Sequence, residues 1–113
     1  MSGEEAVEYV KKAFGLEMLR CSRPVDGIRR VALCGGSGGS LIEKARLSGA
    51  RLYISGDISY HQFFTPEGFM VMDIGHFESE RDIVPILFEV IRKKFPTFAI
   101  YTASSTKNPV FYR

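Results

Sequence analysis

Residues 69–80 read Phe-Met-Val-Met-Asp-Ile-Gly-His-Phe-Glu-Ser-Glu, an apolar run followed by a glycine, a histidine and two glutamates. The run from Phe69 to Ile74 has the length and apolar character of a buried strand, and the Gly75-His76 turn follows it directly. In the same way, residues 28–34 lead into a glycine loop at 35–39, and residues 51–55 lead into Gly56-Asp57. Three strand-then-turn units in succession predict a sheet of the α/β class.

Amphipathic segments around these strands predict the helices that cover the sheet. In residues 4–14 the apolar side chains recur every three or four positions, and Gly15 follows as a stop signal. Residues 79–95 also have helical spacing, and Pro85 within them predicts a kink or a late start. The other expected elements are helices at 40–47 and 58–64, a short strand at 16–21, and closing strands at Thr97–Ala103 and Val110–Tyr112.

Together these elements predict one domain over residues 1–113, with a three-layer α/β/α fold and a mostly parallel or mixed sheet. In open α/β sheets, ligands bind outside the carboxyl ends of the strands. The glycine loop, Gly56-Asp57 and Gly75-His76 each follow a strand directly. We therefore expect Gly36, Asp57 and His76 to lie along one edge of the sheet.

The composition is that of a globular protein with little charge imbalance. The 113 residues are 45% hydrophobic, and 15 Lys and Arg against 13 Asp and Glu leave a formal net charge of +2. Basic residues are scattered in short runs, which argues against nucleic-acid binding. No segment resembles a signal peptide or approaches the roughly 20 apolar residues that span a bilayer, so we expect a cytoplasmic protein without membrane contact. Cys21 and Cys34 are too far apart for a Cys-x-x-Cys motif and are expected to be reduced and structural.

His76 and Glu80 are the first candidates for a functional site. If residues 77 onward are helical, these two side chains lie four apart on one face of the first turn, where they can hold one metal ion. The alternatives are a turn histidine that makes a local hydrogen bond and a first-turn carboxylate that favours the helix dipole. A catalytic zinc site normally takes three protein ligands, and the chain has only two histidines, so a complete site needs carboxylates or ligands from elsewhere.

Two further segments carry candidate residues. The glycine loop, with Gly35, Gly36, Ser37 and Gly38, can present backbone N–H groups to an anion, or it can be a tight turn that needs positive φ. It matches neither a P-loop nor a dinucleotide fingerprint. Asp57 is either a helix N-cap or, with His61 four residues on, part of an oriented general base or a support for a metal ligand. His61 also has aromatic neighbours, which suit a histidine that only packs.

Four motifs follow one another in a characteristic order. They are Val-Ala-Leu-Cys-Gly-Gly-Ser-Gly at 31–38, Tyr-Ile-Ser-Gly-Asp-Ile-Ser-Tyr-His at 53–61, Asp-Ile-Gly-His-Phe-Glu-Ser-Glu at 73–80 and Asn-Pro at 108–109. Their order and spacing resemble the C-terminal half of the NIF-three family, the Ngg-one-interacting-factor-three-like group also labelled type 2 homologues of GTP cyclohydrolase I. Because the helix at 4–16 is also similar to the segment before that half's central strand, the resemblance covers nearly the whole chain.

The resemblance implies one half of a two-half α/β/α fold, with two divalent metal ions in the cleft between the halves and ring-like homo-oligomers. His76 and Glu80 match the metal ligands of the C-terminal half, and Asp57 and His61 match a motif that lines the same cleft. The family's paired histidines and bridging aspartate belong to the N-terminal half, which this sequence lacks. The site is therefore expected to be incomplete in this chain, with zinc, manganese or iron as the metals that suit it.

The leading hypothesis from this resemblance is the C-terminal part of a metal-dependent hydrolase-like protein that acts on a nucleotide-like small molecule, with this chain inactive by itself. The alternative is a non-enzymatic interaction or scaffold module with a structural or regulatory metal. An upstream half with paired histidines and an aspartate would favour the hydrolase hypothesis. Its absence would favour the interaction or scaffold module.

Overall fold

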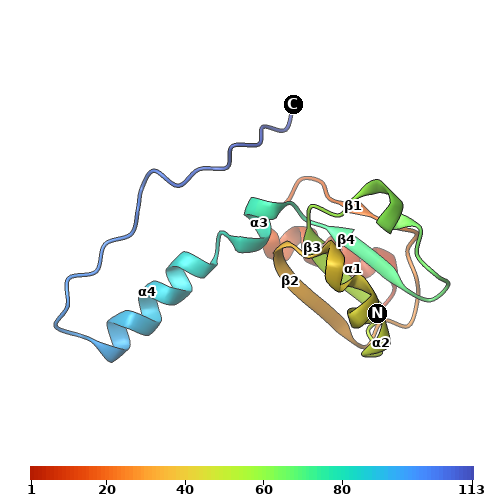
Figure 1. Cartoon of the computed structure of the whole chain (residues 1–113), viewed down its shortest axis with the longest axis horizontal. Coiled ribbons are helices and arrows are strands. Elements are labelled where there is room, and N and C mark those ends of the chain that lie inside the picture. Colours follow the sequence, from red (N-terminus) through yellow and green to blue (C-terminus); the bar gives the residue numbers. More distant parts are fainter. The chain divides into compact units, whose positions relative to one another are not determined.

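A computed structural model describes all residues, 1–113, and it divides into two compact units, Met1–Glu80 and Arg81–Arg113 (Figure 1). Each unit is described by itself. The first unit holds all four strands and the helices that cover them, and the second holds one long helix and the segment that follows it. The candidate site residues named above, from Gly35 to Glu80, all belong to the first unit.

The sheet of the first unit is mixed, as the sequence predicts. Its strands are β1 (Arg20–Cys21), β2 (Val31–Ser37), β3 (Leu52–Gly56) and β4 (Met70–Asp73), in the spatial order β1-β4-β3-β2. The neighbours β2, β3 and β4 run parallel, and β1 is antiparallel to β4. Because the three parallel strands share a direction, their carboxyl ends meet at one edge of the sheet.

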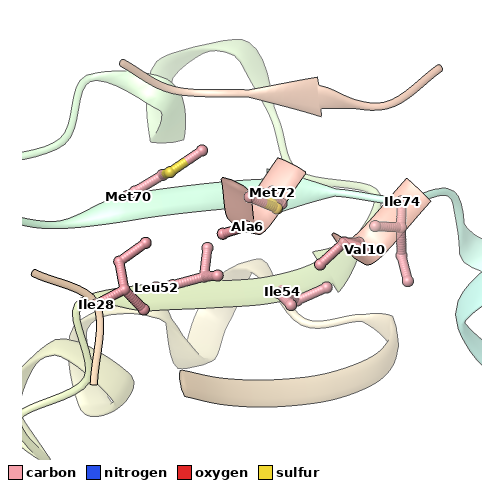
Figure 2. Close-up of a cluster of buried hydrophobic side chains, with 8 residues drawn as sticks. All are labelled: Ala6, Val10, Ile28, Leu52, Ile54, Met70, Met72 and Ile74. Carbon is pink, nitrogen blue, oxygen red and sulfur yellow. The ribbon is translucent and has the colours of Figure 1, made fainter. Parts of the chain in front are cut away.

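One face of the sheet is covered by α1 (Gly3–Phe14). Ser2 and Glu5 form a reciprocal capping box at the start of this helix, and Gly15 ends it in the left-handed conformation at φ 62°. Figure 2 shows the apolar side chains that α1 and the strands bury against one another. This cluster consists of Ala6 and Val10 from α1, Ile28, Leu52 and Ile54, and Met70, Met72 and Ile74.

The opposite face is covered by the 3-10 turn η1 (Gly39–Leu41), by α2 (Ile42–Leu47) and by a second 3-10 turn, η2 (Tyr60–Phe63). Its buried cluster is Ala45, Tyr53, Ile58, Phe69 and Val71, with Phe63 packed against it. Tyr53 and Val71 point away from α1 because successive strand residues face opposite sides. Apolar layers on both faces make the three-layer α/β/α arrangement that the sequence predicts.

Several expected elements differ in extent. The strand expected at 16–21 is reduced to Arg20–Cys21, and β2 begins at Val31 and runs through Gly35 and Gly36 to Ser37. Residues 58–64 hold only the single 3-10 turn η2. These differences have one cause. The ends of helices and strands depend on hydrogen-bonding partners in neighbouring segments, and apolar periodicity in the sequence does not show those partners.

The segment expected as one helix at 79–95 is divided. A short helix, α3 (His76–Glu80), closes the first unit, and α4 (Ile83–Lys94) opens the second. Pro85 lies in the first turn of α4, where a missing backbone donor costs nothing, so the late start predicted from Pro85 is confirmed. Six apolar side chains of α4 are exposed, from 40% for Ile91 to 57% for Val90.

The prediction of closing strands at Thr97–Ala103 and Val110–Tyr112 is wrong, because neither segment is a strand in this structure. A strand requires a neighbour to accept and donate its backbone hydrogen bonds, and the second unit contains no strand that can do so. Apolar composition alone therefore overpredicts strands here. No helix of the chain combines the length and the apolar character that a membrane crossing would require.

A buried carboxylate, Asp73, closes the end of β4. Its Oδ2 accepts from the Ile58 backbone N–H at 2.9 Å and pairs with the Arg20 guanidinium, and its Oδ1 accepts from the Gly75 N–H at 2.9 Å. The side chain is 5% exposed, so these bonds replace the water it would otherwise hold.

We predict that Asp73→Ala lowers the stability of the first unit by about 2–4 kcal/mol, because the buried N–H of Ile58 and the partly buried N–H of Gly75 lose a charged acceptor. The measurement is hydrogen exchange of the β3 and β4 amides, which reports the opening free energy of this unit alone. The exposed Glu67→Ala in the turn before β4 is the control, expected within about 0.5 kcal/mol of the unchanged chain. Equal protection in Asp73→Ala and the control would refute this role.

Candidate metal site at the carboxyl edge of the sheet

Three side chains meet at the carboxyl edge of the sheet. Nδ1 of His76 lies 2.6 Å from Oδ2 of Asp57, and Nε2 of the same ring lies 3.2 Å from Oε2 of Glu80. About half of each side chain is exposed, from 49% for His76 to 56% for Asp57. The imidazole is therefore held between two carboxylates while one side of the group stays open to ligands.

The local backbone sets this geometry. His76 begins α3 and Glu80 ends it, so the two side chains lie one helical turn apart on the same face. Asp57 follows β3 with φ 51°, the left-handed conformation that few residues other than glycine, asparagine and aspartate adopt. This conformation directs the chain after β3 so that the Asp57 carboxylate reaches His76 across the sheet edge.

Gly36 makes room for the pair. A Cβ atom on Gly36 would lie 2.4 Å from Glu80 Oε1 and 3.4 Å from His76 Nε2, and the residue has φ 70°. Its backbone N–H donates to Ser79 Oγ at 2.7 Å, and the Ser79 hydroxyl in turn donates to the His76 carbonyl at 2.7 Å. The glycine loop thus supports α3 through its own backbone, and only glycine permits this close approach.

Asp73 fixes the two turns that carry the site. It binds the N–H of Ile58, next to Asp57, and the N–H of Gly75, next to His76. Gly56 adds a close contact, since a Cβ atom there would lie 2.8 Å from the His76 Cα. The positions of Asp57 and His76 are therefore linked through buried groups as well as by their own hydrogen bond.

The two carboxylates favour the charged form of the histidine. The hydrogen bond to Asp57, followed by the charges of Glu80 and Asp57, raises the pKa of His76 above its ordinary value. The protonated ring donates from both nitrogens, and the neutral ring donates from Nδ1 to Asp57 and leaves Nε2 as an acceptor. Loss of one proton thus converts a closed ion-pair network into a nitrogen ligand beside a carboxylate.

The donor set fits part of a metal site. Nε2 of His76 and the carboxylate of Glu80 are the nitrogen and oxygen ligands that zinc, manganese and iron accept. Asp57 on the other ring nitrogen is the partner that metal-ligating histidines commonly have. No group of three or more His, Cys, Asp or Glu side chains converges on one metal position. This chain therefore brings together two candidate ligands, His76 and Glu80, and one carboxylate, Asp57, that can orient the histidine.

The structure brings some of the predicted site residues together and gives others different partners. Gly36, Asp57 and His76 share one edge, as predicted. The carbonyl of Gly38 accepts a buried hydrogen bond from the Tyr53 hydroxyl at 2.7 Å. His61 lies in η2, edge-on to Tyr60 at 5.4 Å, and Asp57 is bonded to His76 instead of His61.

Sequence reasoning missed two residues that position the site, Ser79 and Asp73. Ser79 joins the glycine loop to α3, and its side chain gives no signal beyond its place three residues after His76. Asp73 was recognisable, because a carboxylate that ends a fully apolar strand must find buried donors. Glu78 lies in the same motif as Glu80, but its side chain is buried whereas that of Glu80 is not.

Comparison with known proteins gives consistent matches. Residues 1–109 match the family described as Duf34/NIF3 (NGG1p interacting factor 3). The chain is 40% identical over 115 aligned residues to a Campylobacter jejuni protein named GTP cyclohydrolase 1 type 2 homolog, covering 99% of this chain and 45% of that protein. It is 34% identical to a Lactococcus lactis protein of the same name, covering 92% and 42%.

Among solved structures, a Bacillus cereus protein related to NIF3 superposes on the whole chain with a TM-score of 0.76 and 25% identity, and the match covers 33% of that chain. The chain thus spans less than half the length of each of these three relatives. The superposition on the Bacillus cereus structure supports the α/β/α architecture seen here.

We predict that Asp57→Asn lowers the pKa of His76 in the metal-free protein, because the neutral amide no longer stabilises the imidazolium. Asparagine keeps the shape of the side chain and tolerates the left-handed backbone. The stabilisation by Asp57 is fully present below the unfolded-state pKa of the histidine and is lost as the pH rises through the raised folded-state pKa. NMR titration of the His76 ring measures the shift; Glu67→Gln is the matched control, and an unchanged His76 pKa in Asp57→Asn would contradict the assignment.

Proposed function

The chain belongs to the Duf34/NIF3 family, and on that premise we propose that it forms one side of a metal-binding cleft in a metal-dependent hydrolase-like protein. The observation that carries the proposal is the His76–Glu80 pair, 3.2 Å apart on α3, with Asp57 on the remaining ring nitrogen. This is a nitrogen and oxygen donor pair with its orienting carboxylate already in place.

In this proposal each residue has a separate task. Nε2 of His76 and one oxygen of Glu80 hold a divalent ion, and Asp57 keeps the proton on Nδ1 so that Nε2 remains the ligand. Gly36 and Ser79 hold α3 in position without contacting the ion. A bound divalent ion supplies Lewis-acid polarisation and activation of water.

Metal binding competes with protons at this site. The raised pKa of His76 means that a proton must leave Nε2 before the ion binds, so affinity rises with pH through the pKa of His76. Asp57 then has two opposing effects, since it favours the proton and also orients the ligand. Its net contribution is measurable only above the His76 pKa, where the ring is already neutral.

The relatives named GTP cyclohydrolase 1 type 2 homolog support a nucleotide-like small molecule as the substrate class. Because this chain spans less than half of each relative, we propose that a second half supplies the remaining ligands and that the complete protein assembles as a homo-oligomer. Chemistry by this chain alone is not expected, because two ligands leave the ion weakly held.

We predict weak divalent-metal binding by this chain, detected by NMR titration with Zn²⁺ or Mn²⁺ above the His76 pKa. The affected amides lie in α3 and beside Asp57. His76→Ala and Glu80→Gln remove the saturable response, and Asp57→Asn weakens it about tenfold or more. His61→Ala is the histidine-matched control and retains binding. An undiminished response in His76→Ala would rule out the ligand assignment.

A chain that carries both halves of the family fold tests the reaction itself. It is expected to bind metal tightly and to hydrolyse members of a nucleotide panel only when loaded, with His76→Ala losing most of the bound metal by elemental analysis. Tight metal binding without hydrolysis of any nucleotide would instead favour a scaffold or regulatory role for the metal.

A further inference from the structure

A second feature of the first unit lies at the amino ends of the strands, at the sheet edge opposite His76. An open hollow of 510 Å³ is lined by Gly27, Arg29, Arg30, Gly49 and Arg51. Arg30 precedes β2 and Arg51 precedes β3, and the two are joined by a backbone hydrogen bond from Arg51 N to Arg30 O at 3.0 Å. We call this feature the arginine hollow.

Backbone carbonyls hold two of its guanidinium groups in place. Arg30 Nη1 donates to the Ser48 carbonyl, and Arg51 Nε donates to the Gly68 carbonyl at 3.2 Å. Each contact uses one donor of a group that has five, so the remaining donors are available to a ligand. Side chains fixed in this way lose less conformational freedom when they bind.

The glycine turns let these guanidinium groups lie close to the backbone. A Cβ atom on Gly49 would lie 3.2 Å from Arg30 Nη1, and Gly49 has φ 85°, which only glycine adopts without strain. A Cβ atom on Gly27 would lie 3.6 Å from Arg51 Nη1. Both guanidinium groups therefore lie close to the backbone at these glycine turns.

The positive charge of the hollow is not neutralised within the chain. Arg20, Arg46 and Arg92 each form an ion pair with a carboxylate, but no ion pair involves Arg29, Arg30 or Arg51. Three unneutralised cations around one concavity raise the local concentration of anions. A planar guanidinium with parallel N–H donors matches a phosphate group best.

We propose that the arginine hollow binds a phosphate-bearing small molecule, at a site separate from the metal site. Its volume lies within the range of about 300–1,000 Å³ that is usual for small-ligand pockets. Arg30 and Arg51 hold the phosphate oxygens through fixed donors, and Arg29 adds a third charge from the rim. The proposal is independent of the metal, because no residue of the carboxyl edge takes part.

The test is an NMR titration of the full chain with inorganic pyrophosphate at constant ionic strength. We expect saturable shifts of the Arg30 and Arg51 side-chain N–H signals and of the amides at 27–30 and 49–51, with α3 unaffected. Arg51→Gln is expected to weaken binding at least about tenfold, the loss of a charge-assisted contact. Arg29→Gln weakens it without disturbing any internal hydrogen bond. Arg23→Gln, which removes the same charge outside the hollow, leaves the affinity unchanged.

Two further titrations identify the source of the phosphate. If adenosine monophosphate binds more tightly than inorganic phosphate and adenosine does not bind, the ligand is an organic phosphate. Equal affinity for adenosine monophosphate and inorganic phosphate supports the free anion as the ligand. The proposal is overturned if pyrophosphate gives no saturable shift, if Arg23→Gln weakens binding as much as Arg51→Gln, or if a glutamate-rich peptide saturates the hollow and pyrophosphate does not.

Discussion

The rest of the first unit depends on the hydrogen bonds and the ion pair that the Asp73 carboxylate forms. It lies at the end of β4 and bonds the chain on three sides: Arg20 from β1, the turn after β3 through Ile58, and the turn after β4 through Gly75. A single buried side chain therefore joins the antiparallel edge strand to both turns that carry the candidate site. Because a buried carboxylate is costly without such donors, its presence constrains all three segments at once.

Much of the architecture follows from local patterns in the sequence. The run at 69–74 and the run at 51–55 are strands because each is apolar, short and bounded by turn residues, and each strand is found within one or two residues of its predicted limits. The rule that ligands gather at carboxyl ends then places Gly36, Asp57 and His76 together without any knowledge of contacts. The spacing of four between His76 and Glu80 likewise fixes their common face once α3 forms.

The remaining features depend on partners that a sequence pattern does not show. Asp57 has φ 51° and turns toward His76, whereas a helical reading of 58–64 would have paired it with His61. The expected strands near the C-terminus required neighbours that the second unit does not contain. The arginine hollow gave no local signal either, since Arg30 and Arg51 are 21 positions apart and meet only because β2 and β3 are adjacent.

The boundary between α3 and α4 has an evolutionary consequence. Glu80 is the last residue of the first unit, so both candidate ligands and all the groups that orient them lie before the boundary. Because α3 alone sets the spacing of His76 and Glu80, substitutions, insertions or fusions after residue 80 do not change it. The sequence after residue 80 can therefore change without altering the spacing of the two candidate ligands.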